Sequence, residues 1–388
     1  MPIAVLKLPF LIQQGICREM NYSQLTVMSF CSLRTRRLIE FLNLTIPNLY
    51  YDSPKEYFLC GIYFGNEFRR VLVAREDQSL LITDTQEIKL GSVKIKVRFS
   101  SELDDKGNIY YNMYVPRIDR TIEGAMQEHI NSLFHYLGPN YLTITMNSNR
   151  LPNLINVTNS YIEGENIDVK VLEDYFTKNP NHQSANIRAV IDGEIAEDSK
   201  IWNIDGVCIL NEADGMFPKR FTGQHLCLFN VPVKVPEIAL FLKGWVSNTG
   251  YRNLKTLHLE WENNTLWAFN NLMNRFTGLK TYQPDPPNES WRCIYNPQII
   301  GMNPSEIEIK APYVFEINRI DGKKAFVYCN LKGIRLFVDS DAELSRRREK
   351  HEKNDINGAL APDEIERGTK LPSTDEESSW AGGKQLDK

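Results

Sequence analysis

The chain has 388 residues, a net charge of −4 and a hydrophobic fraction of 42%, which is typical of a globular protein with two or more domains. A net negative charge gives the chain no overall positive potential that would attract a nucleic acid. No stretch approaches the roughly 20 apolar residues needed to span a membrane. We therefore expect no nucleic acid and no membrane among its partners. Seven scattered cysteines without a Cys-x-x-Cys pair predict buried thiols in a reducing, intracellular compartment, cytoplasmic and/or nuclear.

Residues 1–45 predict two or three short helices. Ile12, Ile16 and Met20 recur every four residues, so on a helix they form one apolar stripe. Ser23 is the expected N-cap of a second helix. Such short helices cannot bury an adequate core alone, so their surplus apolar surface has to contact the rest of the chain or another protein.

The same residues resemble an F-box, the helical module that docks substrate receptors on the Skp-type adaptor of cullin-based ubiquitin ligases. The sequence of residues 6–10 and 32–38 resembles the nematode F-box family more than it resembles the general F-box consensus. Leu11, Gln24 and Thr35 stand where many F-boxes have Glu, Asp and Trp. The resemblance implies that the adaptor is contacted by Leu8, Pro9, Ile12, Ile16, Met20, Leu25, Met28 and Leu38.

Residues 46–140 predict a strand-rich segment that closes with a helix. A connector is expected over 43–54, which contains two prolines. Short β-rich runs separated by turn-forming groups predict strands at 58–64, 70–74, 79–83, 93–97 and 109–115. Helical spacing of apolar residues then predicts a helix over 123–137.

Residues 141–338 contain an internal echo, by which we mean two segments with a similar sequence pattern. A helix, a loop and a strand are expected over 169–191 and again over 233–259. Further strands are predicted at 142–146, 207–210 and 226–229. Strands that alternate with helices at repeating distances favour a short leucine-rich-repeat-like stack, and a chance echo in an α/β domain is the competing explanation. Asp321-Gly322 between two strand-like runs predicts a closing β-hairpin.

Parts of this region also resemble the type 2 F-box-associated region of nematode F-box proteins, at 236–245, 253–259 and 315–327. The resemblance implies an α+β chain in which an adaptor-binding F-box is joined to a target-recruiting region. The chain would then be the substrate-recognition subunit of a Skp–cullin–F-box ubiquitin ligase. Its partners would be a Skp-type adaptor, through it a cullin, and an unknown target protein.

Catalytic and metal-binding motifs are absent from the sequence. It has no phosphate-binding loop, no Gly-x-Ser-x-Gly and no His-Glu-x-x-His, and its six histidines lack metal-ligand spacing. We therefore expect no enzyme activity, no catalytic residue, no metal and no cofactor. Two alternatives stay open: a non-ligase interaction scaffold whose N-terminal helices complete its own core, and a hydrolase whose active site is assembled from distant residues.

Two tryptophans are candidate anchors for the target protein. Trp261 and Trp267 flank two asparagines near the end of the repeat-like part. Tryptophan is favoured at binding surfaces because it buries a large area at a low cost in conformational entropy. The geometry of a strand–helix stack, which presents one exposed sheet face, favours target binding within about 141–282.

Residues 339–388 predict a charged, disordered tail. Proline, glycine, serine and acidic residues prevail there, and large apolar residues are few. A stretch of this composition cannot bury enough apolar area to offset the entropy lost on ordering.

Limited proteolysis should therefore cut the chain first after Ser340. The trimmed product, residues 1–340, should keep the thermal unfolding midpoint of the full chain. A midpoint that drops by many degrees after trimming would contradict the prediction, because it would show that the tail packs on the body.

Overall fold

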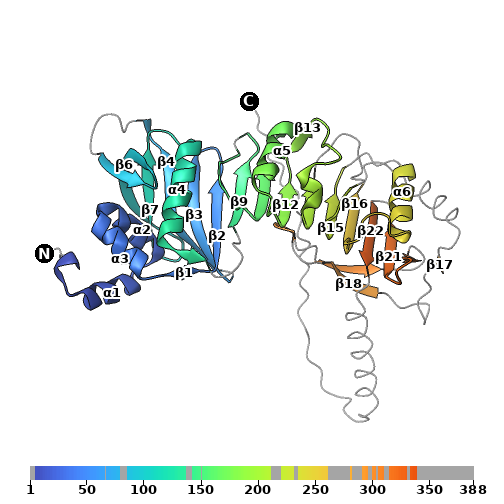
Figure 1. Ribbon diagram of the computed structural model, residues 1–388, viewed down its shortest axis with the longest axis horizontal. Coiled ribbons are helices and arrows are strands. Elements are labelled where there is room, and N and C mark those ends of the chain that lie inside the picture. Colours follow the sequence, from blue (N-terminus) through green and yellow to red (C-terminus); the bar gives the residue numbers. More distant parts are fainter. Residues whose placement is uncertain are drawn as a thin grey trace, which may run out of the picture. The chain divides into compact units, whose positions relative to one another are not determined.

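Figure 1 shows the computed structural model of the chain. Every described residue lies in one compact unit, Met1–Asp339. The structure describes residues 5–65, 67–78, 85–136, 142–149, 151–210, 220–230, 235–260, 280–281, 291–295, 299–302, 305–309, 314–329 and 333–338. The predicted tail at 339–388 and the predicted strand at 79–83 lie outside the described residues.

Short helices open the described part, as the apolar stripe predicts. They are η1 (Val5–Lys7), α1 (Phe10–Glu19), α2 (Tyr22–Cys31) and α3 (Leu33–Phe41). The prediction that Ser23 is the N-cap of α2 is wrong. Asn21 caps α2, because its side chain accepts a hydrogen bond from the Gln24 amide at 2.8 Å and the Gln24 side chain accepts one from the Asn21 amide at 3.0 Å. Ser23 is instead buried, and its hydroxyl accepts a hydrogen bond from the Tyr111 amide.

Sixteen strands of the described part join in one mixed sheet, in the order β17-β20-β21-β22-β16-β15-β14-β12-β10-β9-β2-β3-β4-β7-β6-β5 (Figure 1). Its N-terminal strands are β2 (Asn48–Ser53), β3 (Tyr57–Phe64), β4 (Glu67–Glu76), β5 (Gln86–Leu90), β6 (Val93–Leu103) and β7 (Ile109–Val115). The strands predicted at 58–64, 70–74, 93–97 and 109–115 are thereby confirmed. The connector predicted at 43–54 is wrong, because β1 (Thr45–Ile46) and β2 lie in it.

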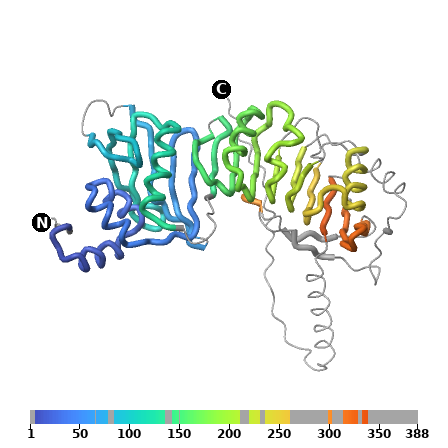
Figure 2. Tube along the Cα trace, viewed as in Figure 1, coloured from blue at the N-terminus to red at the C-terminus, as the bar shows by residue number. Residues whose placement is uncertain are grey.

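The centre of the sheet is a parallel run. It consists of β2, β9 (Leu142–Asn147), β10 (Asn159–Glu163), β12 (Ser184–Ile187), β14 (Gly206–Ile209), β15 (His225–Leu228) and β16 (Thr256–Glu260). Because β2 pairs with β9, the sheet continues across the predicted domain boundary at 140/141. Figure 2 follows this run from the blue strands through green to yellow.

Antiparallel strands complete the sheet beyond β16. They are β17 (Lys280–Thr281), β20 (Val314–Asn318), β21 (Lys324–Cys329) and β22 (Gly333–Val338). The predicted hairpin joins β20 to β21, and Gly322 in its turn has a φ of +89°, which favours glycine. Three small parallel or antiparallel pairs lie apart from the large sheet: β1 with β8 (His135–Tyr136), β11 (Asn166–Asp168) with β13 (Val190–Asp192), and β18 (Trp291–Tyr295) with β19 (Ser305–Ile309).

The longer helices confirm the internal echo. α5 (Val169–Lys178) leads through a loop to β12, and α6 (Val235–Val246) leads through a loop to β16. The short helix η3 (Lys200–Asn203) precedes β14. The helix predicted over 123–137 is α4 (Arg120–Leu133), which begins earlier because Asp119 caps the amides of Thr121 and Ile122. No described helix has the length and apolarity needed to cross a membrane.

The two faces of the parallel run have different surroundings. Ser160 of β10 faces the helices, because its hydroxyl hydrogen-bonds the Tyr175 hydroxyl of α5 at 2.8 Å. Side chains alternate along a strand, so Asn159 and Tyr161 point to the opposite face. We call this opposite side the open face. On β2 the same alternation buries Leu49 and Tyr51 in the core, and leaves Tyr50 and Asp52 on the open face.

The buried side of β2 gives a stability prediction. Leu49 is fully buried in the core, so Leu49→Ala should lower the free energy of unfolding by about 2–5 kcal/mol through the lost burial and the cavity. The matched control is Leu103→Ala, because Leu103 of β6 is 66% exposed and its truncation should change stability by about 0.5 kcal/mol or less. Urea unfolding measures both, and equal effects of the two substitutions would contradict the central place of β2.

Candidate docking surface and sheet-face pocket

Large apolar side chains are exposed on two of the N-terminal helices. Leu11 and Ile12 in α1 expose 78% and 50% of their surface, and Phe10 and Phe41 are also exposed. The rings of Phe10 and Phe41 meet edge to face at 5.2 Å, so the start of α1 lies beside the end of α3. We call Phe10, Leu11, Ile12 and Phe41 the α1–α3 patch. Phe10 and Phe41 contact each other, whereas Leu11 and Ile12 follow on the same turn and point in other directions around α1. Several exposed large apolar side chains in one segment make it a candidate interaction surface.

The eight predicted adaptor-binding residues fall into three groups. Pro9 and Ile12 are exposed, and Leu8 and Ile16 are half-buried. Met20 and Met28 are partly buried against the core. Leu25 and Leu38 are only 1% and 5% exposed and belong to that core, so the prediction that their side chains contact a partner is wrong.

The physical reason is the direction in which the helices pack. α2 contacts β4, β5 and β7, and α3 contacts α2 and α4, so their inward side chains meet the body of the chain. Leu25 and Leu38 lie on those inward sides, within the core of the body. Periodicity shows which residues share a helix face, but it does not show what covers that face.

The structure adds residues that the prediction did not include. Phe10, Leu11 and Phe41 belong to the α1–α3 patch, and Leu33 at the other end of α3 is 63% exposed. Leu11 is more exposed than any other large hydrophobic side chain in the described part of the chain. Leu11 lies within the apolar run 8–12, which carries no local signal that this side chain faces solvent.

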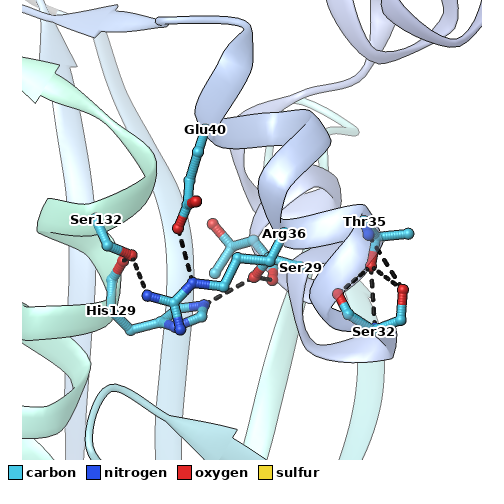
Figure 3. A network of polar contacts seen from close by, with 8 residues as sticks. Ser29, Ser32, Thr35, Arg36, Glu40, His129 and Ser132 are labelled. Carbon is cyan, nitrogen blue, oxygen red and sulfur yellow. Dashed lines mark hydrogen bonds and ion pairs between the residues drawn. The ribbon is translucent and has the colours of Figure 1, made fainter. Parts of the chain in front are cut away.

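A polar network fixes α2 and α3 against α4 (Figure 3). The Ser29 hydroxyl of α2 lies 2.7 Å from Nε2 of His129 in α4. In α3, Arg36 donates a hydrogen bond to the Ser132 hydroxyl of α4 at 2.9 Å and pairs with Glu40 at 2.8 Å. These contacts hold the inward sides of α2 and α3 on the body, and α3 still exposes Leu33 and Phe41 at its two ends.

The environment of His129 determines its protonation. The Ser29 hydroxyl donates its hydrogen to the Thr26 carbonyl, so His129 Nε2 has to donate the hydrogen bond to Ser29. The imidazole also stacks on Phe30, with ring centres 4.4 Å apart. Burial, together with the nearby Arg36 charge, lowers the pKa of His129 to about 3. The ring is therefore neutral throughout the neutral pH range.

A second site is a pocket of about 580 Å³ on the open face of the sheet. Strand register brings its residues together: Tyr50 of β2 is opposite Thr143 of β9, and Thr145 of β9 is opposite Tyr161 of β10. Its lining is Tyr50, Tyr63, Thr143, Thr145, Asn159, Tyr161, Ile299, Ile300 and Gly301. The sequence did not indicate this site, because its residues come from three distant segments.

Aromatic packing holds one wall of the pocket in place. Tyr50 meets Tyr63 and Phe68 edge to face, with ring centres 5.5 and 5.4 Å apart. The Tyr50 hydroxyl donates a hydrogen bond to Oγ1 of Thr145 at 2.9 Å. Burial raises the pKa of Tyr50 and of Tyr63, and the Asp52 charge adds to the rise in both. The phenols are therefore neutral.

The turn at residues 299–301 forms the opposite wall. The Ile300 amide donates to the Ser184 hydroxyl at 2.7 Å, and the Asn186 amide group donates to the Ile300 carbonyl at 2.8 Å. Gly301 has a φ of +72°, and a Cβ there would lie 2.5 Å from the Tyr161 ring. The turn thus needs glycine to approach the sheet this closely.

Other expected features of the site are placed as follows. Trp261 and Trp267, the predicted target anchors, lie outside the described residues. Within the described part of the chain, no group of three His, Cys, Asp or Glu side chains could hold a metal ion. No protein-family model, no curated protein and no solved structure matches the chain.

The neutral His129 predicts a pH dependence of stability. Its pKa is about 6.5 when unfolded and about 3 when folded, so below pH 6.5 only the unfolded state binds the proton. Stability is therefore lost as the pH falls from about 6.5 towards 3, and His129 alone should account for about 2 kcal/mol between pH 7.5 and 5.

The variant His129→Gln tests this, because glutamine can donate to Ser29 and does not titrate. Urea unfolding at pH 7.5 and 5 should show a fall in the wild type that is about 2 kcal/mol larger than in the variant. His182 and His225 also have lowered pKa values through burial and add the same fall to both proteins. An equal fall in both proteins would contradict the assignment.

Proposed function

We propose that the chain is the substrate-recognition subunit of a Skp–cullin–F-box ubiquitin ligase. It docks on a Skp-type adaptor through α1 and α3 and recruits a target protein through the open face of the sheet. The main support for the proposal is the α1–α3 patch, because its exposed apolar side chains lie in the segment whose amino-acid sequence resembles an F-box.

Energetics favour a permanent partner for this patch. Burying a large apolar side chain is worth about 1.5–3 kcal/mol, so Phe10, Leu11, Ile12 and Phe41 together offer a substantial gain before the cost of association is subtracted. The polar network around His129 keeps α2 and α3 on the body, so Phe41, the α3 member of the patch, is held in place before binding. Pre-organisation of this kind lowers the entropic cost of docking.

The parallel run supports the finer proposal of a leucine-rich-repeat-like stack. From β9 to β16 each strand pairs in register with the next, and α5, η3 and α6 lie between successive strands along the chain. Such a stack presents one side chain from each strand to a shared surface, a geometry that repeat proteins use for partners. The open face would hold the target in this way.

The proposed chain carries no chemistry of its own. It would act by proximity, because a target held near a charged conjugating enzyme experiences a high effective concentration of the reactive group. The reaction itself belongs to the other subunits of the ligase.

A second candidate function is a non-ligase interaction scaffold. It is favoured by the placement of Leu25 and Leu38, which join the N-terminal helices to the core of the body. In this alternative the helices complete the fold, and the α1–α3 patch contacts a partner other than the adaptor. Adaptor binding by the purified chain separates the two candidates.

The double substitution Leu11→Asp and Ile12→Asp tests adaptor docking. Both side chains are exposed, so the fold should persist, whereas charge buried against an apolar partner surface is costly. Adaptor affinity should fall at least about thirtyfold, the equivalent of about 2 kcal/mol for a true anchor. The measurement is a binding titration of the full chain with purified Skp-type adaptor.

The matched control is Leu240→Asp with Ile320→Asp, two side chains that are 67% and 75% exposed outside the N-terminal helices. The control should bind the adaptor as the wild type does. Undiminished binding by the Leu11 and Ile12 variant, or no binding by the wild type, would contradict the proposed function.

A further inference from the structure

The open face carries an unusual number of aromatic rings around the pocket. Tyr50, Tyr63 and Phe68 form one cluster, and Tyr161 lies on the other side of Thr145. Aromatic faces attract cations through the ring quadrupole, most strongly where water is excluded. The pocket volume of about 580 Å³ lies within the roughly 300–1,000 Å³ range of ligand sites.

Two carboxylates lie beside the aromatic rings. Asp52 follows Tyr50 by two residues on β2, and Glu163 follows Tyr161 by two residues on β10, so both side chains lie on the open face. Burial raises the pKa of Asp52 despite a hydrogen bond from the Tyr57 hydroxyl, and the Glu163 charge raises it further. A cation bound between the two carboxylates would relieve their repulsion.

The open face already pairs its own arginines with its tyrosines. Arg70 lies over Tyr110 at 4.7 Å, and Arg75 lies over Tyr57 at 5.7 Å. Arg188 lies over the ring of Tyr161 at 5.0 Å. Across the described ranges, no arginine or lysine of the chain lies over the rings of Tyr50 or Tyr63.

We propose that the pocket binds an arginine side chain of a partner protein, which lies against Tyr63 and Tyr50 and pairs its guanidinium charge with Asp52, two residues beyond Tyr50 on the same face of β2. Arginine suits the site better than lysine, because its planar guanidinium stacks on aromatic rings, pairs with carboxylates in a fork and is weakly hydrated. That this partner is a target for ubiquitylation rests on the proposed function. The chemistry of the pocket does not.

The test uses the full chain and four short peptides. The probe is acetyl-Gly-Ser-Gly-Arg-Gly-Ser-Gly-amide, and the other three peptides carry lysine, citrulline or leucine in place of arginine. Citrulline keeps the shape of arginine and removes its charge. Ligand-observed NMR titrations should show the arginine peptide binding at least about tenfold more tightly than the citrulline and leucine peptides, and several-fold more tightly than the lysine peptide.

Substitutions locate the binding site. Tyr63→Ala and Asp52→Asn should each weaken arginine-peptide binding at least about fivefold. Tyr63→Phe should retain it, because the ring remains. The matched control is Asp174→Asn, which removes the same charge from an exposed side chain on α5, against the opposite face of the sheet, and should leave binding unchanged. Circular dichroism and the thermal midpoint verify that each variant is folded.

Several outcomes would overturn the proposal. Equal binding of the arginine and citrulline peptides would remove the role of charge, and preference for leucine would make the pocket a purely apolar site. Equal or tighter lysine binding would remove the role of the guanidinium. An effect of Asp174→Asn as large as that of Asp52→Asn would show non-specific attraction to an acidic protein.

Adaptor titrations keep this test separate from the proposed function. Tyr63→Ala and Asp52→Asn should leave adaptor binding at the wild-type level, and the Leu11 and Ile12 variant should bind the arginine peptide normally. If the wild-type chain binds the arginine peptide and not the adaptor, the pocket proposal is supported and the proposed ligase function is contradicted. If the wild-type chain binds the adaptor and not the arginine peptide, only the pocket proposal is contradicted.

Discussion

The pairing of β2 with β9 is the interaction on which the rest of the structure depends. β2 is antiparallel to β3 on one side and parallel to β9 on the other, so it joins the strand-rich segment to the parallel run. Leu49 and Tyr51 fill the core below it, and Tyr50 and Asp52 contribute to the open face above it. A shift of one residue in register would exchange these two faces, so the core and the pocket are specified together.

The same division between a buried and an open side explains the N-terminal helices. α2 buries its inward side on the sheet and on α4, and the Ser29–His129 and Arg36–Ser132 contacts fix that orientation. The exposed side chains of α1 are then presented away from the core. We propose that two surfaces of one unit serve two partners: the α1–α3 patch an adaptor, and the open face a target.

Local patterns in the sequence predicted those parts of the fold that local forces determine. The strand at 93–97, the helix at the start of 233–259 and the Asp321-Gly322 turn all appear in the structure. β2 was missed because six residues between two prolines resemble a connector, and only its neighbours β3 and β9 make it a strand. Leu25 and Leu38 were assigned to the wrong surface, because apolar periodicity shows which residues share a helix face and not whether that face packs on the chain itself or on a partner. The pocket was unpredictable, since strand register alone brings Tyr50, Thr143 and Tyr161 together.

Hydrogen–deuterium exchange of the full chain, with and without purified Skp-type adaptor, tests whether α1 and α3 form the docking surface. We expect the adaptor to slow amide exchange in α1 and α3, where Leu11 and Phe41 are exposed, and to leave exchange in β9 and β10 unchanged. Slower exchange confined to the open-face strands, or no change anywhere in the chain, would contradict it.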